Sequence, residues 1–464
     1  MLKSLIIKIT MKQKTTRFAL TLLVMMLTTA TAWADNINVE TAAGFGTLTD
    51  GKYTLVNGNT YTLTEDVNTA GYIYVPEGVT ATIDLNGHTI DRGLTNAITN
   101  GMVIWVAGSL TVTDSGTGGK IKGGMDSSAD HVSCVMVYSE NGGAAFILQG
   151  GTLIGNTSYE YNRAVMGGNN TSITVSGGKI TGDIYGVYSY GNITVSGGEI
   201  SGNTIGIRSL NYSISVSGNP VITNNTNANV RLYSSLTIAG ELTAGANIGI
   251  TSSIPTDNAP VTVTSGYGTY NTASPDTYFT VDNNSFVLGW NEDKTEIAVG
   301  TALYTVNFDM NGHGDAIDAV SLLSGYKVAE PTEPTADNWY FVGWYTDAAC
   351  TAGNEYDFDN AVTSNMTLHA LWTQEAIYSF TLPEKMVIVS TTNAPVGGKY
   401  PVGTVIKFKV SSADYVVDGD VSDGTNTLTP DGDGIYTITM GETDITITAT
   451  VKKAVEPNKT LSGS

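Results

Sequence analysis

A short motif recurs along the chain and limits what the chain can fold into. Each copy has an alternating apolar stretch, a turn of small residues and a second short apolar stretch. The copies begin at Ile83, Leu110, Phe146, Ile173, Ile193, Ile214, Leu236 and Val261. Successive starts lie between 20 and 36 residues apart, and the gaps from Ile173 to Leu236 are 20, 21 and 22 residues. A spacing of about 20 residues is typical of one coil of a parallel β-helix, so longer gaps indicate inserted loops.

The residues inside one copy support this interpretation. Ile173 and Val175 alternate with polar residues, so both point inward from one strand. Gly177 and Gly178 allow the backbone to turn, and Ile180 returns to the core. Stacked coils place equivalent positions about 4.8 Å apart, so we expect Val175, Val195 and Val216 to form one interior column. No segment after residue 34 shows a helical period, and the chain is predicted to be all-β.

A second column is expected ten residues after each central start. These positions hold Asn156, Asp183, Asn203 and Asn224. Short polar side chains at one corner can bond their own coil and the next coil, which predicts a structural ladder. The alternative makes Asp183 a lone catalytic acid. We favour the ladder, because general acid–base chemistry needs a second group that a single carboxylate lacks.

The first 34 residues have the pattern of a secretory signal. They contain five Lys/Arg and no Asp/Glu, an apolar run over residues 18–27, and the small-residue sequence Ala32-Trp33-Ala34. This predicts a cleaved signal peptide, with Met11 as the true start, and therefore an exported protein with no transmembrane segment after cleavage. The alternative is a membrane anchor, but the apolar run is short for a spanning helix.

Charge excludes several classes of partner. Five of the 22 Lys/Arg lie in the signal, so 17 remain against 43 Asp/Glu, a mature net charge of about −26. Nucleic acid and anionic membranes need a basic footprint and are excluded; long acidic polysaccharides are disfavoured. The simplest explanation of this negative charge is a solvated protein surface. Cys134 and Cys350 fall in different predicted domains, so we expect no disulfide and two small buried apolar residues.

One resemblance covers about residues 50–270. The run from Ile73 to Ile90, which contains Asn86-Gly87-His88, resembles the opening coil of pectin-lyase-like β-helices of bacterial surfaces, and residues 110–121 resemble their second coil. The resemblance implies a right-handed single-stranded parallel β-helix. It implies little about activity, because this fold hosts lyases, hydrolases, adhesins and inert spacers. His88 lies in a turn and is interpreted as structural.

A second resemblance covers residues 304–372, where aromatic residues become dense. The runs Tyr340-Phe-Val-Gly-Trp344-Tyr345 and Met366-Thr-Leu-His-Ala-Leu-Trp372 resemble the Listeria–Bacteroides repeat, also called the internalin B-repeat-like domain. This implies a small β-grasp-like extracellular module associated with surface display and interaction. Trp344, Tyr345 and Trp372 could be ligand platforms, but we favour core positions, since so small a domain needs them for folding.

Two further segments complete the predicted organisation. Three strands within Tyr278–Val299 are expected to cap the solenoid. In residues 375–453, Tyr436–Met440 and Asp444–Ala449 predict a hairpin that resembles divergent members of the same repeat group. Aspartates 418, 420, 423, 431 and 433 are assigned to turns in preference to a calcium site. The predicted domains are 1–34 signal, 35–300 β-helix with cap, 301–374 repeat, 375–453 divergent repeat and 454–464 polar tail.

Two classes of function remain open. The favoured class is an exported cell-surface or secreted scaffold, adhesin-like, with a glycan or cell-surface protein as partner and no cofactor or metal. The alternative is a polysaccharide-active lyase or hydrolase, for which the best remaining cluster is Asp126, Asp130, His131 and Glu140. For glycan binding, the candidate residues are Tyr185, Tyr188, Tyr190, Tyr233 and Arg208. The alternative for these residues is that they only cover the solenoid exterior.

Overall fold

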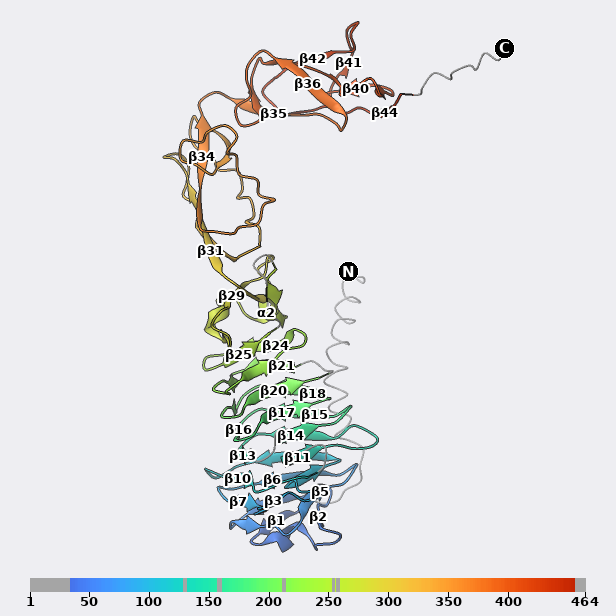
Figure 1. Ribbon diagram of the computed structural model, residues 1–464, viewed down its shortest axis with the longest axis vertical. Coiled ribbons are helices and arrows are strands. Elements are labelled where there is room, and N and C mark those ends of the chain that lie inside the picture. The colour runs from blue at the N-terminus through green and yellow to red at the C-terminus, as the bar shows by residue number, and fades with distance from the viewer. Residues whose placement is uncertain are drawn as a thin grey trace, which may run out of the picture. The chain divides into compact units, whose positions relative to one another are not determined.

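The computed structural model describes residues 34–127, 132–156, 161–210, 214–252, 255 and 259–454 (Figure 1). The predicted signal peptide, its Met11 start and nearly all of the predicted polar tail lie outside these residues. The chain divides into two compact units, with residues 300–454 in the second unit and most of the preceding residues in the first. Within the described residues, no helix has the length and apolar character needed to cross a membrane.

The first unit is a parallel β-helix whose coils each contribute strands to three ladders, seen as stacked arrows in Figure 1. The predicted all-β class is confirmed. The first ladder is a ten-stranded sheet among the described residues. Its strands are β1 (Asn36–Val39), β3 (Thr60–Leu63), β6 (Thr80–Asp84), β9 (Ser109–Thr113), β12 (Ala145–Leu148), β15 (Ser172–Val175), β18 (Asn192–Val195), β21 (Ile214–Gly218), β24 (Leu236–Leu242) and β27 (Thr264–Ser265).

The other two ladders form the second and third faces and join at their last strands. The second face contains β4 (Val67–Asn68), β7 (Thr89–Asp91), β10 (Lys120–Lys122), β13 (Thr152–Ile154), β16 (Lys179–Thr181), β19 (Glu199–Ile200) and β22 (Val221–Ile222). The third face contains β2 (Lys52–Thr54), β5 (Tyr72–Val75), β8 (Ile104–Val106), β11 (Val132–Val137), β14 (Arg163–Gly167), β17 (Tyr185–Ser189), β20 (Ile205–Ser209) and β23 (Ala228–Arg231). Both faces end in β25 (Asn247–Thr251) and β28 (Phe279–Val281).

The interior column predicted from the repeat is confirmed. Val175 pairs with Val195, Val195 pairs with Val216, and all three side chains are fully buried. The glycine turn works as expected, since Gly178 has φ +69°. Gly177 meets the neighbouring coil so closely that a Cβ there would lie 2.1 Å from the carbonyl oxygen of Gln149. Such close approach excludes any larger residue.

Two of the looser copies are out of register with the central ones. Ile83 pairs with Val112, so the first copy in phase with Leu110 begins at Ala81. Leu236 pairs with Thr264, whereas Val261 lies in β26 (Val261–Thr262), which runs antiparallel to β30 (Ile297–Gly300). At the first place the alternation gave the right inward face but not the phase, because a shift of two residues keeps the same face. At the second place the predicted start belongs to an antiparallel strand outside the coil ladder.

Both ends of the solenoid carry additional short elements. The 3-10 helix η1 (Ala42–Phe45) lies at the first coil and buries Phe45. At the other end, the three predicted strands are present as β28, β29 (Val287–Trp290) and β30. Helix α2 (Tyr267–Tyr270) buries Tyr267 against Phe279 and Trp290, and η2 (Pro275–Thr277) precedes β28. These elements cover apolar side chains that an open last coil would expose.

The second unit begins with a four-stranded sheet in the order β32-β31-β34-β33. Its strands are β31 (Leu303–Asp309), β32 (Val320–Leu323), β33 (Tyr340–Tyr345) and β34 (Met366–Thr373). Trp344, Tyr345 and Trp372 are buried, which confirms the prediction that they are core residues.

The remaining strands of this unit form small sheets. They are β35 (Ile377–Thr381), β36 (Met386–Thr391), β37 (Lys399–Pro401), β38 (Val405–Val410), β39 (Tyr415–Val417), β40 (Val421–Ser422), β41 (Thr427–Leu428), β42 (Tyr436–Thr439), β43 (Ile445–Thr446) and β44 (Val451–Lys453). The predicted hairpin is wrong: β42 pairs with β38, and β43 runs parallel to β35.

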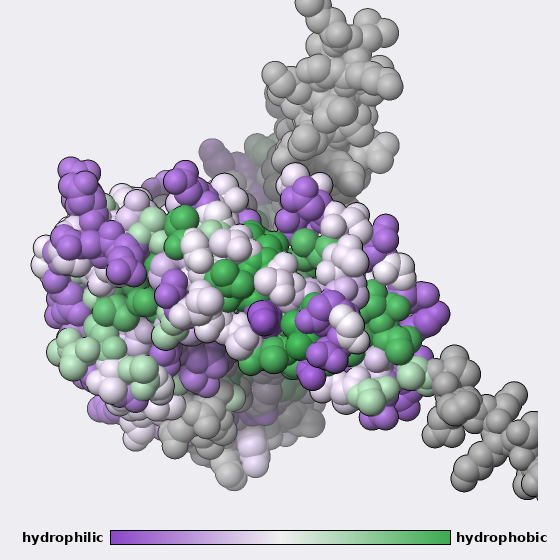
Figure 2. Space-filling view, turned by 90° about the horizontal axis from the view of Figure 1, so that it is seen from above, coloured by the Kyte–Doolittle hydropathy of each residue, from purple (hydrophilic) through white to green (hydrophobic). Residues whose placement is uncertain are grey.

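Figure 2 shows hydrophobic patches between hydrophilic side chains on the face of the molecule that it presents.

Candidate functional site on the third face

The outer surface of the third face carries a continuous column of large side chains. Because side chains alternate along a strand, one position per coil faces outward between two inward ones. The parallel register aligns these outward positions from coil to coil. We call this set the outer column; it consists of Tyr74, Trp105, Met136, Met166, Tyr188, Arg208 and Arg231.

Arginine and tyrosine side chains interleave along the later part of this face. The Arg163 guanidinium lies over the Tyr188 ring, 4.3 Å from its centroid. Arg208 lies 5.7 Å from the Tyr185 and Tyr188 rings and 5.8 Å from the Tyr233 ring, and its Nη1 donates to the Tyr185 hydroxyl at 3.2 Å. Such cation–π contacts hold a guanidinium against the aromatic rings.

The predicted glycan-binding residues differ in how accessible they are. Tyr185 and Tyr188 expose only 7% of their surface, pack edge-to-face on each other, and belong to an apolar cluster outside the main core. Tyr190 packs on Tyr188 and is half-buried. Tyr233, by contrast, exposes 61% of its surface. The structure therefore brings all five residues onto one face, but Tyr233 offers the most open ring.

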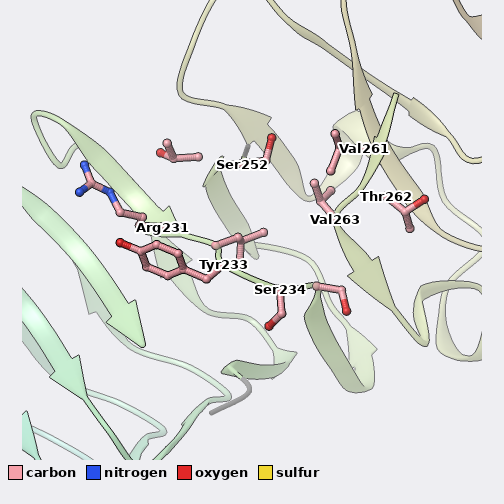
Figure 3. Close-up of a pocket in the computed structure, with 10 residues that line it drawn as sticks. Arg231, Tyr233, Ser234, Ser252, Val261, Thr262 and Val263 are labelled. Atoms are coloured by element: carbon pink, nitrogen blue, oxygen red, sulfur yellow. The ribbon is translucent and has the colours of Figure 1, made fainter. Parts of the chain in front are cut away.

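A cavity of about 450 Å³ lies beside Tyr233, which follows strand β23 of this face (Figure 3). Arg231 and Tyr233 lie beside each other on one side of the view, while Val261 and Val263 lie on the other. Hydroxyl side chains complete the lining, which comprises Arg231, Leu232, Tyr233, Ser234, Ser235, Thr251, Ser252, Val261, Thr262 and Val263. Its size is that of a small-molecule pocket. The sequence did not predict the cavity, because its walls come from three separate strands and their loops.

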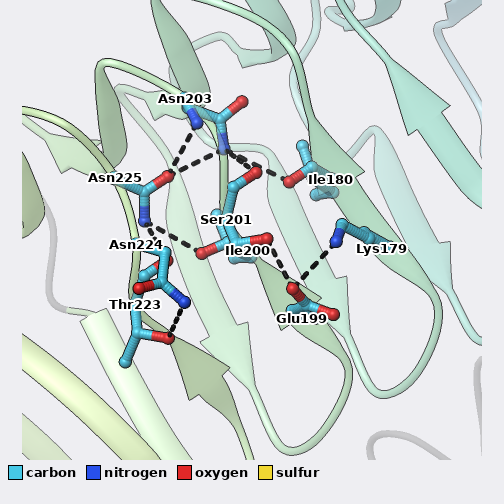
Figure 4. Close-up of polar contacts among 9 residues, drawn as sticks. All are labelled: Lys179, Ile180, Glu199, Ile200, Ser201, Asn203, Thr223, Asn224 and Asn225. Carbon is cyan, nitrogen blue, oxygen red and sulfur yellow. Dashed lines mark hydrogen bonds and ion pairs between the residues drawn. The ribbon is translucent and has the colours of Figure 1, made fainter.

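The polar ladder exists, with one corrected member. Asn203 Oδ1 accepts from the Asp183 amide at 3.2 Å, and Asn203 donates to Asn225 Oδ1 at 3.0 Å (Figure 4). The ladder continues through Asn229 to Asp282. Asn224 is exposed, at φ +57°, and is not a member. The coil that begins at Ile214 has one more residue before its second strand, since Ile222 pairs with Ile200.

Asp183 is a buried member of this ladder and exposes 1% of its surface. Its Oδ2 accepts from the Ser133 hydroxyl at 2.5 Å and the Asn156 amide at 3.1 Å, while Oδ1 accepts from the Ile184 amide at 2.8 Å. Burial raises the pKa of Asp183 to about 7, against the opposing effect of these hydrogen bonds. Asn156 thus joins the ladder through its backbone amide.

Only two members of the candidate catalytic cluster lie within the described residues, and they differ in burial. Asp130 and His131 lie outside the described residues. Asp126 is buried and accepts from the Gly101 amide at 3.3 Å, whereas Glu140 is exposed. Within the described residues, no group of three or more His, Cys, Asp or Glu side chains is arranged to hold a metal ion.

Several other predicted residues have local structural contacts. The His88 amide donates to the Leu85 carbonyl and closes the Asn-Gly turn. Asp423 and Asp431 accept backbone amides of their own turns, as expected of turn residues. Cys134 is buried and Cys350 is half-exposed, which corrects the expectation that both are buried; both thiols are free.

The described residues define a class of protein: a long parallel β-helix with small β domains appended. Residues 304–371 match the Listeria-Bacteroides repeat domain, which confirms the resemblance of that segment. Two proteins of Evansella cellulosilytica, provisionally named a membrane protein and a Gly-rich membrane protein, are each 36% identical to the chain over 69 residues. Those residues are 15% of this chain but only 10% and 8% of the two relatives. No solved structure matches the chain significantly.

Proposed function

We propose that this protein is a bacterial cell-surface scaffold whose β-helix binds glycan at the cavity beside Tyr233 on the third face. The surface location is supported by the Listeria-Bacteroides repeat and by the membrane-protein names of the two partial relatives. The N-terminal signal pattern adds to this support.

One observation carries the binding proposal. Tyr233 exposes 61% of its surface, has its ring within 5.8 Å of the Arg208 guanidinium, and borders the cavity. An aromatic face offers an apolar surface to the C–H face of a sugar, and the neighbouring hydroxyls and guanidinium donate and accept hydrogen bonds. Apolar walls with a few converging polar groups are the usual composition of a small-ligand site.

Binding is tested on a glycan array with the labelled mature chain. We expect a set of bound glycans whose affinity falls about tenfold in Tyr233→Ala, equivalent to ~1.4 kcal/mol. Tyr270→Ala is the matched control, because Tyr270 is also exposed and belongs to the same unit but does not line the cavity. An array without any bound glycan, or equal losses in the two variants, would refute the proposal.

Location is tested separately in the producing bacterium. Intact cells are treated with a membrane-impermeant biotin reagent, and the N-terminus of the recovered protein is determined by mass spectrometry. We expect labelling and a mature chain that begins at Asp35. An unlabelled chain that retains Met1 or Met11 would contradict export.

A further inference from the structure

Among the described residues, the arginines lie on or against the third face of the β-helix. After residue 34 the sequence contains only Arg92, Arg163, Arg208 and Arg231. Arg163, Arg208 and Arg231 belong to strands of the third face. Arg92 contacts the Tyr72 ring of that face and donates to the carbonyls of Asn100 and Met102. A chain of net charge about −26 therefore places three of its four described arginines on strands of a single face.

Two of these arginines occupy neighbouring positions without a carboxylate between them. Arg208 and Arg231 are directly paired in adjacent strands β20 and β23. Neither forms a salt bridge with any residue in the described part of the chain, although Lys122 and Lys179 of the second face pair with Asp91 and Glu199. Like charges at paired positions are destabilising. This arrangement is explained if an anion from outside the chain binds beside the pair.

Asp282, a carboxylate that bonds to a residue of the cavity wall, is already engaged by hydrogen-bond donors. Asp282 Oδ1 accepts from the Asn229 side chain at 2.5 Å, and Oδ2 accepts from the Asn229 amide at 2.8 Å and the Thr251 hydroxyl at 2.5 Å. Asp282 thus ends the polar ladder and holds Thr251 at the cavity wall. It does not neutralise Arg231 by a direct ion pair.

The cavity combines one cation with an amphipathic lining. Arg231 supplies a planar guanidinium that can hold a carboxylate through two parallel hydrogen bonds. Tyr233, Val261 and Val263 supply apolar surface, and Ser234 and Thr262 supply hydroxyl groups. Phosphate and sulfate have no apolar face for the valines and the ring, whereas an acidic sugar has a carboxylate, hydroxyls and a C–H face on one small ring.

We propose that this cavity binds a carboxylate-bearing saccharide, with the carboxylate on Arg231 and the sugar ring against Tyr233. The inference rests on the proposed function and names the ligand class of the same site. A single acidic sugar or a short acidic chain end fits the cavity. A long polyanion, by contrast, is repelled by the acidic remainder of the chain.

The test is calorimetric titration of the mature chain with D-glucuronate, D-galacturonate and N-acetylneuraminate, each beside its neutral counterpart or methyl ester. We expect at least one acid to bind about tenfold more tightly than its neutral form, corresponding to ~1.4 kcal/mol. The difference should shrink with added salt, while neutral binding stays constant. The three acids distinguish uronic from sialic acid recognition.

Substitutions locate the effect. Arg231→Gln should remove the preference for the acid and leave neutral-sugar affinity unchanged, while Arg231→Lys should retain part of it, because lysine keeps the charge and loses the bidentate geometry. Lys120→Gln, at an exposed lysine of the second face, is the charge-matched control and should retain the full preference. The acid–neutral comparison in the unaltered chain needs no variant and stands even if Arg231→Gln does not fold.

The outcomes separate the two proposals. Equal affinity for acids and neutral sugars, or an acid preference that survives Arg231→Gln in a folded protein, overturns this inference while glycan binding stands. If neither sugars nor array glycans bind, the proposed function fails together with it.

Discussion

Asn203 and Asn225 lie on successive coils of the β-helix, and the Asn203 side-chain amide donates to Asn225 Oδ1 across 3.0 Å. The same Asn203 amide also donates to the carbonyls of Ile180 and Ser201. One buried side chain therefore ties the polar corner of three coils. Its hydrogen bonds satisfy backbone groups that water cannot reach.

We expect Asn203→Ala to lower the free energy of unfolding by about 2–3 kcal/mol, because buried donors and acceptors lose their partners. Asn224→Gly is the matched control. Asn224 is exposed and adopts positive φ, which glycine accepts without strain, so a change within ~0.5 kcal/mol is expected. Urea unfolding monitored by circular dichroism measures both. Equal effects of the two substitutions would return Asn224 to the ladder.

A second buried column of the same ladder, formed by isoleucines, gives another prediction. Ile193 is fully buried between Ile173 and Ile214 of the adjacent coils, whereas Thr194 on the same strand faces outward. Ile193→Ala should cost about 2–5 kcal/mol through lost burial and a cavity. Thr194→Ala should stay within ~0.5 kcal/mol. A small loss for Ile193→Ala would mean that the coils repack around the gap.

The repeat predicted the coils because each copy contains its own inward apolar residues and its own turn. Each coil pairs with the next copy along the sequence, so no distant segment decides the pairing. The same locality explains the errors. An extra residue in one coil moves the polar corner from Asn224 to Asn225, and pattern counting from Ile214 does not detect it. The partners of β42 and β43 are strands β38 and β35. The observed pairing is therefore long-range, and the local pattern that suggested a hairpin could not predict it.

The candidate site was only partly predictable for a related reason. Tyr188 and Arg208 are separated by the 20-residue spacing of their two coils, and the strand register pairs them. Their burial could not be predicted, because it depends on how neighbouring outward side chains, such as Met166 and Ile205, pack beside them. The cavity at Arg231 and Tyr233 combines β23, β25 and β26, which are separated by loops without a recognisable motif.

The edge of the second unit provides a third prediction. Among the described residues β36 pairs only with β38, and Val387, Ile388 and Val389 of β36 are all exposed, Ile388 at 38%. An apolar edge strand promotes intermolecular strand pairing. Ile388→Lys should therefore raise the concentration at which the chain aggregates, as measured by light scattering. Val402→Lys, at an exposed valine in the turn after β37, is the control; an equal improvement there would assign the effect to net charge alone.

The last prediction concerns Asp183 and pH. Its folded pKa is about 7, above the usual value of 3.8, because burial disfavours the charged carboxylate, against the opposing effect of the hydrogen bond from Ser133. Between about pH 4 and pH 7 the folded chain holds a proton that the unfolded chain has released, so this group makes stability fall as pH rises through that window. The loss is of the order of 4 kcal/mol, from a shift of roughly three pH units.

In Asp183→Asn, which has no proton to lose, this component of the slope disappears. Urea unfolding at pH 5 and pH 8 should therefore show a smaller decrease for the variant than for the unaltered chain. Asp114→Asn, at a carboxylate that accepts backbone amides of a half-buried turn, controls for the removal of a charge and should leave the decrease unchanged. If Asp183→Asn keeps the full pH dependence, the buried carboxyl is ionised throughout, and the ladder holds a charge where the structure indicates a proton.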